Sequence, residues 1–246
     1  MRSNLFPMVA IGCWPVLTIA GVLQIGCNGR SRPSSDAAHE RSFDEQIAAV
    51  RNGAGDRIEL ESQGLGDADL DRLAGLDNLR VVLLDNAANS LSDAGLEKLA
   101  RLPKLQHLRV RGGDFGDRGL AALAGCRELQ ILNLPVTHAT DAGLAQLSRL
   151  PKLVQLRIGS PTITTAGLQS LEQFPELRRL HLIDVPVSDA GLAVLQQLPQ
   201  LESLYLDGAR ASDSAYAALF RARPTLHVHI NQSHHDHDPQ HQTHAH

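Results

Sequence analysis

Leucine returns at a fixed spacing through the middle of this 246-residue chain. The motif L-x-x-L-x-[LVI] begins at five positions 24 residues apart: Leu105, Leu129, Leu153, Leu177 and Leu201. Leu79 precedes the first of them by 26 residues. Self-similarity at such a period is typical of repeat architectures. A single unit of this length cannot bury its own apolar face, so successive units must stack to form a continuous core.

Each repeat contains two patterns, which predict a strand followed by a helix. In LQHLRV (105–110) apolar and polar residues alternate at the end of the motif, as in a strand with one buried face. In TDAGLAQLSRLPKL (140–153) the leucines recur at steps of three, which is a helical spacing. Four hydroxyl residues and four acidic residues stand where helix starts are expected, and four prolines stand where helices should end: Ser92, Thr140, Thr164 and Ser188; Asp93, Asp117, Asp141 and Asp189; Pro103, Pro151, Pro175 and Pro199.

One glycine recurs inside each predicted helix, where it is less favourable than alanine by up to about 1 kcal/mol. These residues are Gly95, Gly119, Gly143, Gly167 and Gly191. We explain them by close stacking of successive helix starts. This hypothesis predicts that Gly143→Leu lowers the melting temperature.

The repeated S/T-D-A-G-L block and the leucine motif resemble the leucine-rich repeat family, and in particular its cysteine-containing subtype found in F-box proteins and in bacterial relatives, including bacterial lipoproteins. The string LAGCREL places Cys126 where that subtype often has its cysteine. The resemblance implies a right-handed α/β solenoid of about seven 24-residue repeats, with short parallel strands on the concave face and helices on the convex face. The subtype's residue just after the strand is replaced by Gly113, Thr137, Pro161, Val185 and Ala209.

Composition agrees with one packing environment used many times. The chain has 40 leucines, 43% hydrophobic residues and only 3% aromatic residues. We therefore expect a narrow slot between each strand and helix that leucine fills and an aromatic ring does not.

The repeat region, residues 55–230, needs protected ends. Upstream, residues 42–54 predict a capping helix with a Ser42/Glu45 capping box and with Phe43, Ile47 and Val50 on one face. A degenerate first repeat follows, with a strand at Ile58 and Leu60 and a helix over 67–76. Downstream, residues 211–224 keep the helix, and Leu226, Val228 and Ile230 form a last strand whose register is ambiguous by one residue.

Residues 1–27 predict an export signal, because a single early Arg2 precedes a long apolar stretch. The stretch LQIGC resembles a bacterial lipobox, which implies lipidation of Cys27, although Gln24 departs from that motif. Plain secretion and an uncleaved membrane anchor are the alternatives. Residues 28–41 are polar and read as a tether. With Cys13 removed, Cys126 has no disulfide partner and is expected to be a small buried hydrophobe.

The outward strand positions are the first candidate binding surface, because the repeat does not constrain them. They include residues expected to contact a partner: His107, Arg109, Arg111, Asn133, Gln155, Arg157, Arg178, Arg179, His181 and Tyr205. The five arginines suggest a locally basic patch, which favours an acidic protein or another anionic polymer as partner. An ordinary solvated strand face is the alternative reading.

The second candidate surface is the histidine-rich segment at the end of the chain, of which residues 231–246 are expected to be disordered without metal. Neutral imidazoles bind Zn, Ni or Cu, and carboxylates can add oxygen ligands. The candidate ligands are His227, His229, His234, His235, Asp236, His237, Asp238, His241, His244 and His246.

The sequence contains no recognisable phosphate-binding loop, nucleophile elbow or isolated carboxylate pair. We therefore expect a non-enzymatic, exported and lipid-anchored scaffold that needs no cofactor and binds a macromolecular partner through its concave face. The alternative is an envelope protein that binds or buffers metal through its tail. A formal net charge of -4 gives no reason to expect binding to nucleic acid.

Overall fold

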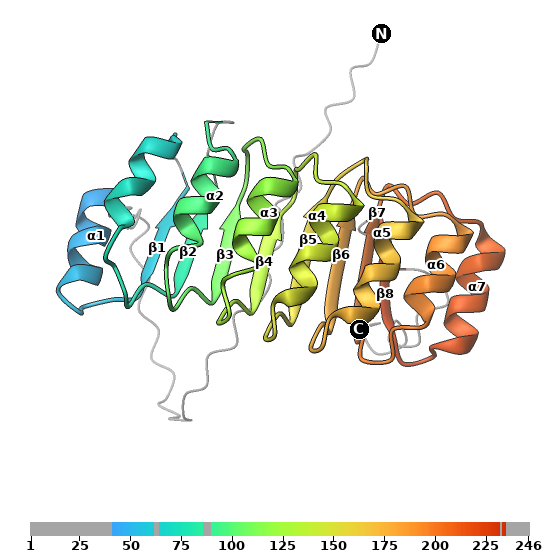
Figure 1. Ribbon diagram of the computed structural model, residues 1–246. Coiled ribbons are helices and arrows are strands. Elements are labelled where there is room, and N and C mark those ends of the chain that lie inside the picture. Colours follow the sequence, from blue (N-terminus) through green and yellow to red (C-terminus); the bar gives the residue numbers. More distant parts are fainter. Residues whose placement is uncertain (1–40, 62–63, 86–89, 232, 235–246) are drawn as a thin grey trace, which may run out of the picture. The chain divides into compact units, whose positions relative to one another are not determined.

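The computed structural model describes residues 41–61, 64–85, 90–231 and 233–234. Within them, eight parallel strands form one sheet in strict chain order, and a short ninth strand pairs antiparallel with the eighth (Figure 1). The strands are β1 (Arg57–Leu60), β2 (Val81–Leu84), β3 (His107–Val110), β4 (Ile131–Leu134), β5 (Gln155–Gly159), β6 (Arg179–Ile183), β7 (Ser203–Asp207), β8 (His227–Ile230) and β9 (Ser233–His234).

A helical segment follows each of the first seven strands and packs on the same face of the sheet (Figure 1). The helices are α1 (Phe43–Arg51), η1 (Asp67–Leu73), α2 (Asp93–Leu99), α3 (Asp117–Leu123), α4 (Asp141–Gln146), η2 (Leu147–Arg149), α5 (Thr165–Gln169), η3 (Ser170–Gln173), α6 (Asp189–Gln196) and α7 (Asp213–Ala222), where η marks a 3₁₀ helix. The alternation of strand and helix confirms the expected α/β class.

The structure corrects two details of the expected elements. The strands begin two residues after the recurring leucines, so Leu105 precedes β3 and is buried in the turn that enters it. The helix of the first repeat is a 3₁₀ helix that ends at Leu73, whereas the pattern predicted a helix as far as Leu76. Gly66 stands at its start, and its backbone N–H donates to the carboxylate of Asp69 at 2.8 Å.

A single leucine layer lies between the sheet and the helices. Leu108, Leu132, Leu156 and Leu180 occupy equivalent inward positions on neighbouring strands, and all are at most 1% exposed. The expectation that rings are excluded from this layer is wrong, because Phe115 and Phe174 are also fully buried. Both lie outside the strands and helices: Phe115 stands at a position that varies between repeats, whereas Phe174 replaces the leucine found at Leu150 and Leu198.

The repeated aspartates join each repeat to the next. The carboxylate of Asp117 accepts hydrogen bonds from the backbone N–H of Thr140 at 2.7 Å and from its hydroxyl at 2.6 Å. The Thr140 hydroxyl in turn accepts from the N–H of Ala142 and so caps its own helix. The same two hydrogen bonds, one from the backbone N–H and one from the hydroxyl, recur at four pairs: Asp67 with Ser92, Asp117 with Thr140, Asp141 with Thr164, and Asp189 with Ser212.

This ladder of carboxylates changes the explanation of two positions that recur in the repeats, the aspartate and the glycine at the helix start. The sequence analysis treated the aspartates as charges in the first turn of their own helix, whereas each one also holds the start of the following helix. The pKa of Asp189 is lowered because its carboxylate accepts the backbone and side-chain hydrogen bonds of Ser212. At position 165 the aspartate is replaced by Thr165, so the ladder is interrupted before Ser188.

The ladder also explains the recurring glycines. A Cβ at Gly119 would lie 2.5 Å from a carboxylate oxygen of Asp93, and a Cβ at Gly143 or Gly167 would collide with Asp117 or Asp141 in the same way. Gly191 differs because it faces Thr165: the nearest atoms to its Cβ would be methyl groups at 3.1 Å. The expected close stacking of successive helix starts is therefore confirmed, and its closest contact is with a carboxylate.

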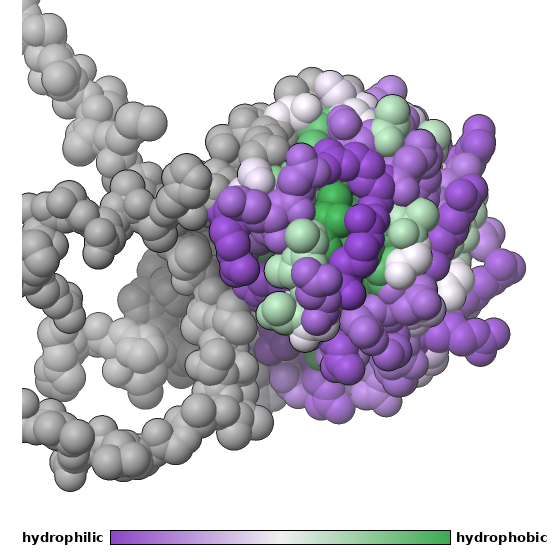
Figure 2. Space-filling model, turned by 90° about the vertical axis from the view of Figure 1, so that its left-hand side faces the viewer, coloured by the Kyte–Doolittle hydropathy of each residue, from purple (hydrophilic) through white to green (hydrophobic). Residues whose placement is uncertain are grey.

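At the first end of the sheet, α1 covers the core. Ser42 and Glu45 form the expected capping box, and Phe43, Ile47 and Val50 are buried. Seen from this end, the described surface is mainly hydrophilic, with only small hydrophobic areas (Figure 2). The helix therefore closes the leucine layer as the sequence predicted.

Gln46 protects the backbone of the first strand, a role that the sequence analysis missed. Its amide donates to the carbonyl of Glu59 at 2.7 Å, and its amide oxygen accepts from the N–H of Glu59 at 2.7 Å. A side chain thus occupies the positions that a neighbouring strand would use on β1.

At the other end, the sheet continues through β8 into β9. The register pairs Tyr205 with His229 and Ser203 with His227, which settles the ambiguous last strand. The expected export signal (1–27) and the expected tether (28–41) except Arg41 lie outside the described residues, as do residues 232 and 235–246 of the tail. Ser233 and His234, which were expected to be disordered, form β9. In the described ranges, no helix is both long and apolar enough to cross a membrane.

Candidate functional site: the open sheet face

The face of the sheet that the helices leave uncovered carries two columns of outward side chains, which we call the open sheet face. The register confirms both columns of the sequence analysis. The central column runs Leu83, Arg109, Asn133, Arg157, His181, Tyr205 and His229, and the adjacent column runs Val81, His107, Ile131, Gln155, Arg179, Ser203 and His227. These side chains stand on rigid strands and differ from repeat to repeat.

Arg109 and Arg111 share the carboxylate of Asp85. Arg109 makes a bidentate pair with Asp85, with Nε to Oδ1 at 2.7 Å and an Nη to Oδ2 at 2.6 Å. Glu59 lies 3.8 Å from the same guanidinium, and the Nε of Arg111 lies 3.7 Å from Asp85. This end of the basic patch therefore offers less free positive charge than the sequence suggested.

Arg178 lies one residue before β6 and does not join the columns. Its guanidinium pairs with Glu202 at 2.9 Å and with Glu176 at 3.6 Å, and these carboxylates raise the pKa of Arg178. By contrast, the neighbouring Arg179 is exposed in the adjacent column.

Arg157 is the cation at the centre of the face. Its Nε is buried and has no hydrogen-bond partner among the described residues, and the same is true of Oδ1 of Asn133, its neighbour in the register. Burial lowers the pKa of Arg157, and the positive charges of Arg111 and Arg109 lower it further. A carboxylate arriving from a partner would satisfy this guanidinium and offset the repulsion.

Two imidazoles on the face, those of His107 and His181, are mainly neutral near pH 7. Burial lowers the pKa of His107 to about 4, with the positive charges of Arg109 and Arg57 adding to the effect. Burial also lowers the pKa of His181, although its hydrogen bond to Asp207 at 2.8 Å opposes that shift. Neither histidine therefore contributes a full positive charge to the patch.

Aromatic and imidazole rings gather at the β6–β8 end. The ring of Tyr205 stacks on His229, with centroids 4.3 Å apart and planes 9° apart, and lies 5.5 Å from His181. His227 and His229 touch through their Nε2 atoms. Such a cluster gives a partner a flat, half-buried surface beside the cation at Arg157.

The histidine-rich segment is described only in part. His227 and His229 lie on β8, and the register places His234 of β9 opposite His229. The other candidate ligands, His235, Asp236, His237, Asp238, His241, His244 and His246, lie outside the described residues. Over the described part of the chain, no group of three or more His, Cys, Asp or Glu side chains could hold a metal ion.

Cys126 is buried, and its thiol lies 3.7 Å from the carbonyl oxygen of Ala100. Burial raises the pKa of this thiol to about 11, so it is protonated and unreactive at neutral pH. This confirms the expected packing role.

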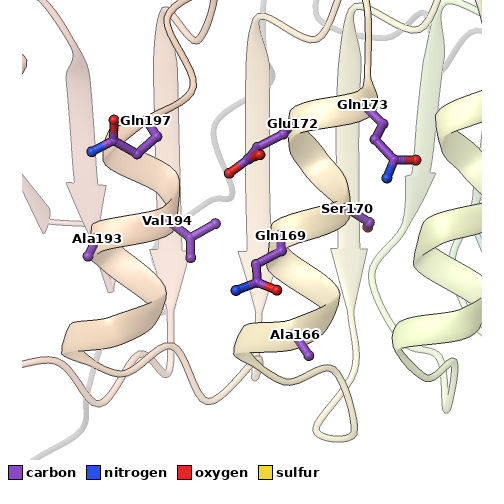
Figure 3. Close-up of a pocket in the computed structure, with 8 residues that line it drawn as sticks. All are labelled: Ala166, Gln169, Ser170, Glu172, Gln173, Ala193, Val194 and Gln197. Atoms are coloured by element: carbon purple, nitrogen blue, oxygen red, sulfur yellow. The ribbon is translucent and has the colours of Figure 1, made fainter.

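A groove of about 660 Å³ lies on the helical side, between the α5–η3 segment and α6 (Figure 3). It is lined by Ala166, Gln169, Ser170, Glu172, Gln173, Ala193, Val194 and Gln197. Figure 3 shows these short and amide side chains along the outer turns of the two helices, with Glu172 the one charged group in the lining. The lining brings together no acid, base and nucleophile, so the groove is a weaker candidate than the open sheet face.

Comparison with known proteins supports the repeat family. A family model described as "FBD-associated F-box protein At5g56370, LRR repeats" matches residues 119–219, and one described as "Leucine Rich repeat" matches residues 101–124. No curated protein matches significantly.

Two solved structures of internalins from Listeria monocytogenes share the fold. An internalin C2 is 24% identical over 76% of this chain and 74% of its own, with a TM-score of 0.57. An internalin (inlF) is 19% identical over 74% of this chain and 54% of its own, with a TM-score of 0.50. At these identities the likeness concerns the fold alone. The repeated strand–helix units, the single parallel sheet and these matches show that the described part of the chain has the fold of an α/β leucine-rich repeat solenoid.

Proposed function

We propose that this protein is a non-enzymatic scaffold that binds an acidic segment of a partner protein through the open sheet face. The observation that carries the proposal is Arg157, a half-buried guanidinium at the centre of the face whose Nε has no hydrogen-bond partner among the described residues. Burying this guanidinium close to the positive charges of Arg111 and Arg109 is unfavourable, and a partner carboxylate bound to the exposed part of the side chain would offset that cost. Arg179 stands diagonally beside it and would extend the contact.

The non-enzymatic part of the proposal is supported by how the ionisable groups of the face are engaged. Asp85 holds Arg109, and Asp207 holds His181. Carboxylates committed to such pairs are not arranged around a vacant position for a substrate, as acid–base chemistry requires. The repeats are also proposed to be of the cysteine-containing subtype, because Cys126 is buried at the position where that subtype often has its cysteine.

The proposal predicts that reversing two charges on the face abolishes partner binding. The full-length protein carrying Arg157→Glu and Arg179→Glu is compared with the wild type in a crosslinking pull-down from cell-envelope extracts. Because a partner carboxylate would then face glutamates, capture should fall by about tenfold or more. A charge-matched control carries Arg127→Glu and Arg149→Glu, two exposed arginines outside the strands.

The control should capture the same protein as the wild type. If the face variant captured as much partner as the wild type, the proposal would be contradicted. It would also be contradicted if the face variant and the control lost capture equally, because that would indicate attraction to net charge alone. Captured material that resists protease would identify an anionic polymer as partner instead of a protein. Unchanged circular dichroism and melting temperature of both variants establish that folding is intact.

We also propose that the protein is exported and lipid-anchored through Cys27. The support is the sequence: a charged start, an apolar stretch and the pair Gly26–Cys27 of a lipobox. Cys27→Ala should move the protein from the membrane fraction to the soluble fraction, because one apolar anchor is lost. Cell fractionation with immunodetection measures this. Continued membrane retention of the variant would contradict lipidation and point to an uncleaved anchor.

A further inference from the structure

The last strand of the parallel sheet carries two histidines on one face. His227 and His229 are two residues apart on β8, so the strand pleat directs both side chains to the open sheet face. Their Nε2 atoms are in direct contact, and their ring centroids lie 4.3 Å apart at an interplanar angle of 73°. Both rings thus direct the same nitrogen to one point.

The fold positions this pair firmly. Val228, between the two histidines, is fully buried and anchors β8 to the leucine layer. Tyr205 on the neighbouring strand stacks against His229 and meets His227 edge-on at 6.0 Å. The rings are therefore held by strand pairing and aromatic packing, whereas the sequence analysis assigned these two histidines to the same group as the tail. Ligands that are already in place lose less conformational freedom when they bind.

Two imidazole nitrogens that converge on one point are suited to a divalent transition-metal ion. Zn–N bonds of about 2.0–2.1 Å in tetrahedral geometry place two ligand nitrogens about 3.3 Å apart. Small rotations of the two rings about their side-chain bonds would open the touching Nε2 atoms to that separation. Imidazole is a preferred ligand of Zn, Ni and Cu.

We propose that His227 and His229 form a two-histidine chelating site for a divalent transition-metal ion at the β8 end of the open sheet face. Since they are two ligands, further coordination positions remain for water or another donor. This site goes beyond the proposed partner binding at Arg157, with which it shares no residue.

The test uses full-length protein in which the five histidines after position 234 are replaced by glutamine: His235, His237, His241, His244 and His246. This background removes the tail imidazoles that would also bind metal. Zn²⁺ and Ni²⁺ are titrated separately by isothermal calorimetry. The proposal predicts one ion per chain, and His227→Gln or His229→Gln in this background should weaken binding by about tenfold or more, since a chelate becomes a single ligand.

The matched control is His138→Gln, which removes an exposed histidine that pairs with Asp114 in a loop. It should leave the affinity unchanged. Substoichiometric Cu²⁺ should broaden the NMR signals of the His227 and His229 rings before those of His107 and His138. Zn²⁺ should raise the melting temperature of the background protein but not of the His229→Gln variant, because metal binds the folded strand only.

Three results would overturn the proposal: no one-to-one binding in the background protein, equal affinity after His227→Gln and His229→Gln, or equal weakening by His138→Gln. Melting temperatures of all variants without metal show whether the strand has kept its packing. If His229→Gln lowers that temperature, the His227→Gln variant decides the outcome, because His227 meets Tyr205 only edge-on.

Discussion

Gly143→Ala should lower the free energy of unfolding by about 3 kcal/mol, a large effect for one added methyl group. The new Cβ would collide with a carboxylate oxygen of Asp117 and would lie 3.1 Å from the Cα of the same residue. The start of α4 must then move away, and both hydrogen bonds from Thr140 to Asp117 are weakened. Chemical denaturation of the purified protein measures the change, and Gly143→Leu should be more damaging still.

Gly191→Ala is the matched control, because it makes the same change at the same position of another repeat. Its nearest neighbours are the methyl groups of Leu168 and Val187, since Thr165 replaces the aspartate there and lies 3.8 Å away. Side-chain methyls can yield by a few tenths of an ångström, and alanine is the better helix former by up to about 1 kcal/mol. We therefore expect a change within about 1 kcal/mol of zero.

A double substitution separates the carboxylate from the backbone contact. Asp117→Ala alone removes the two bonds to Thr140 and should be destabilising. In the Asp117→Ala/Gly143→Ala protein the collision with oxygen is gone. The loss of unfolding free energy in this double variant should therefore be smaller than the sum of the losses in the two single variants, by about 1 kcal/mol or more. Strict additivity, or equal effects of Gly143→Ala and Gly191→Ala, would mean that the ladder does not explain the glycines.

Gln46→Ala should lower the free energy of unfolding by about 2–4 kcal/mol. The substitution removes the side chain that bonds to both the N–H and the carbonyl of Glu59, and it also removes the bond to the carbonyl of Arg41. The backbone groups of β1 would then lack their partner at the edge of the described sheet. Denaturant unfolding measures the loss, and light scattering should show increased self-association through the unprotected strand.

Gln130→Ala is the control for this prediction, because Gln130 is an exposed glutamine just before β4. Its removal should change stability by no more than about 0.5 kcal/mol. Gln46→Glu is the sharper variant: a carboxylate can still accept from the N–H of Glu59 but cannot donate to its carbonyl. We expect it to be destabilising too. Wild-type stability in Gln46→Glu would show that the packing of α1, and not this pair of bonds, protects β1.

The repeat made most of the open sheet face predictable. Once the repeat length and the strand pattern are known, the columns through Arg157 and through Gln155 follow. Every second residue of a strand faces outward, and the equivalent residue of the next repeat is usually 24 positions further along the chain. The state of each side chain does not follow. Arg109 is held by Asp85, which comes from the end of the preceding strand, and Arg178 is held by Glu202 from the next repeat. Such pairs depend on the rotamers of long side chains across two repeats.

Other features were invisible for a related reason. Gln46 is an ordinary polar residue of an amphipathic helix until β1 is placed beside it. Phe115 stands at a position that varies between repeats, and Phe174 stands where Leu150 and Leu198 predict a leucine, so the period alone does not show that the core accepts a ring at either position. Asp117 was correctly placed at a helix start, but the partner of its carboxylate is 23 residues away along the chain.

The sequence by itself determined the period, the strand and helix of each repeat, the buried leucines and the order of the outward side chains. These are local patterns, and stacking copies of one unit leaves a single register that buries the recurring leucines. Only the tertiary structure decided which carboxylate meets which guanidinium, why glycine is required at Gly143 but replaceable at Gly191, and that His227 and His229 meet on a rigid strand. The physical reason is that these contacts join neighbouring repeats, where tenths of an ångström and single rotamers determine whether two groups clash, pair or remain unsatisfied.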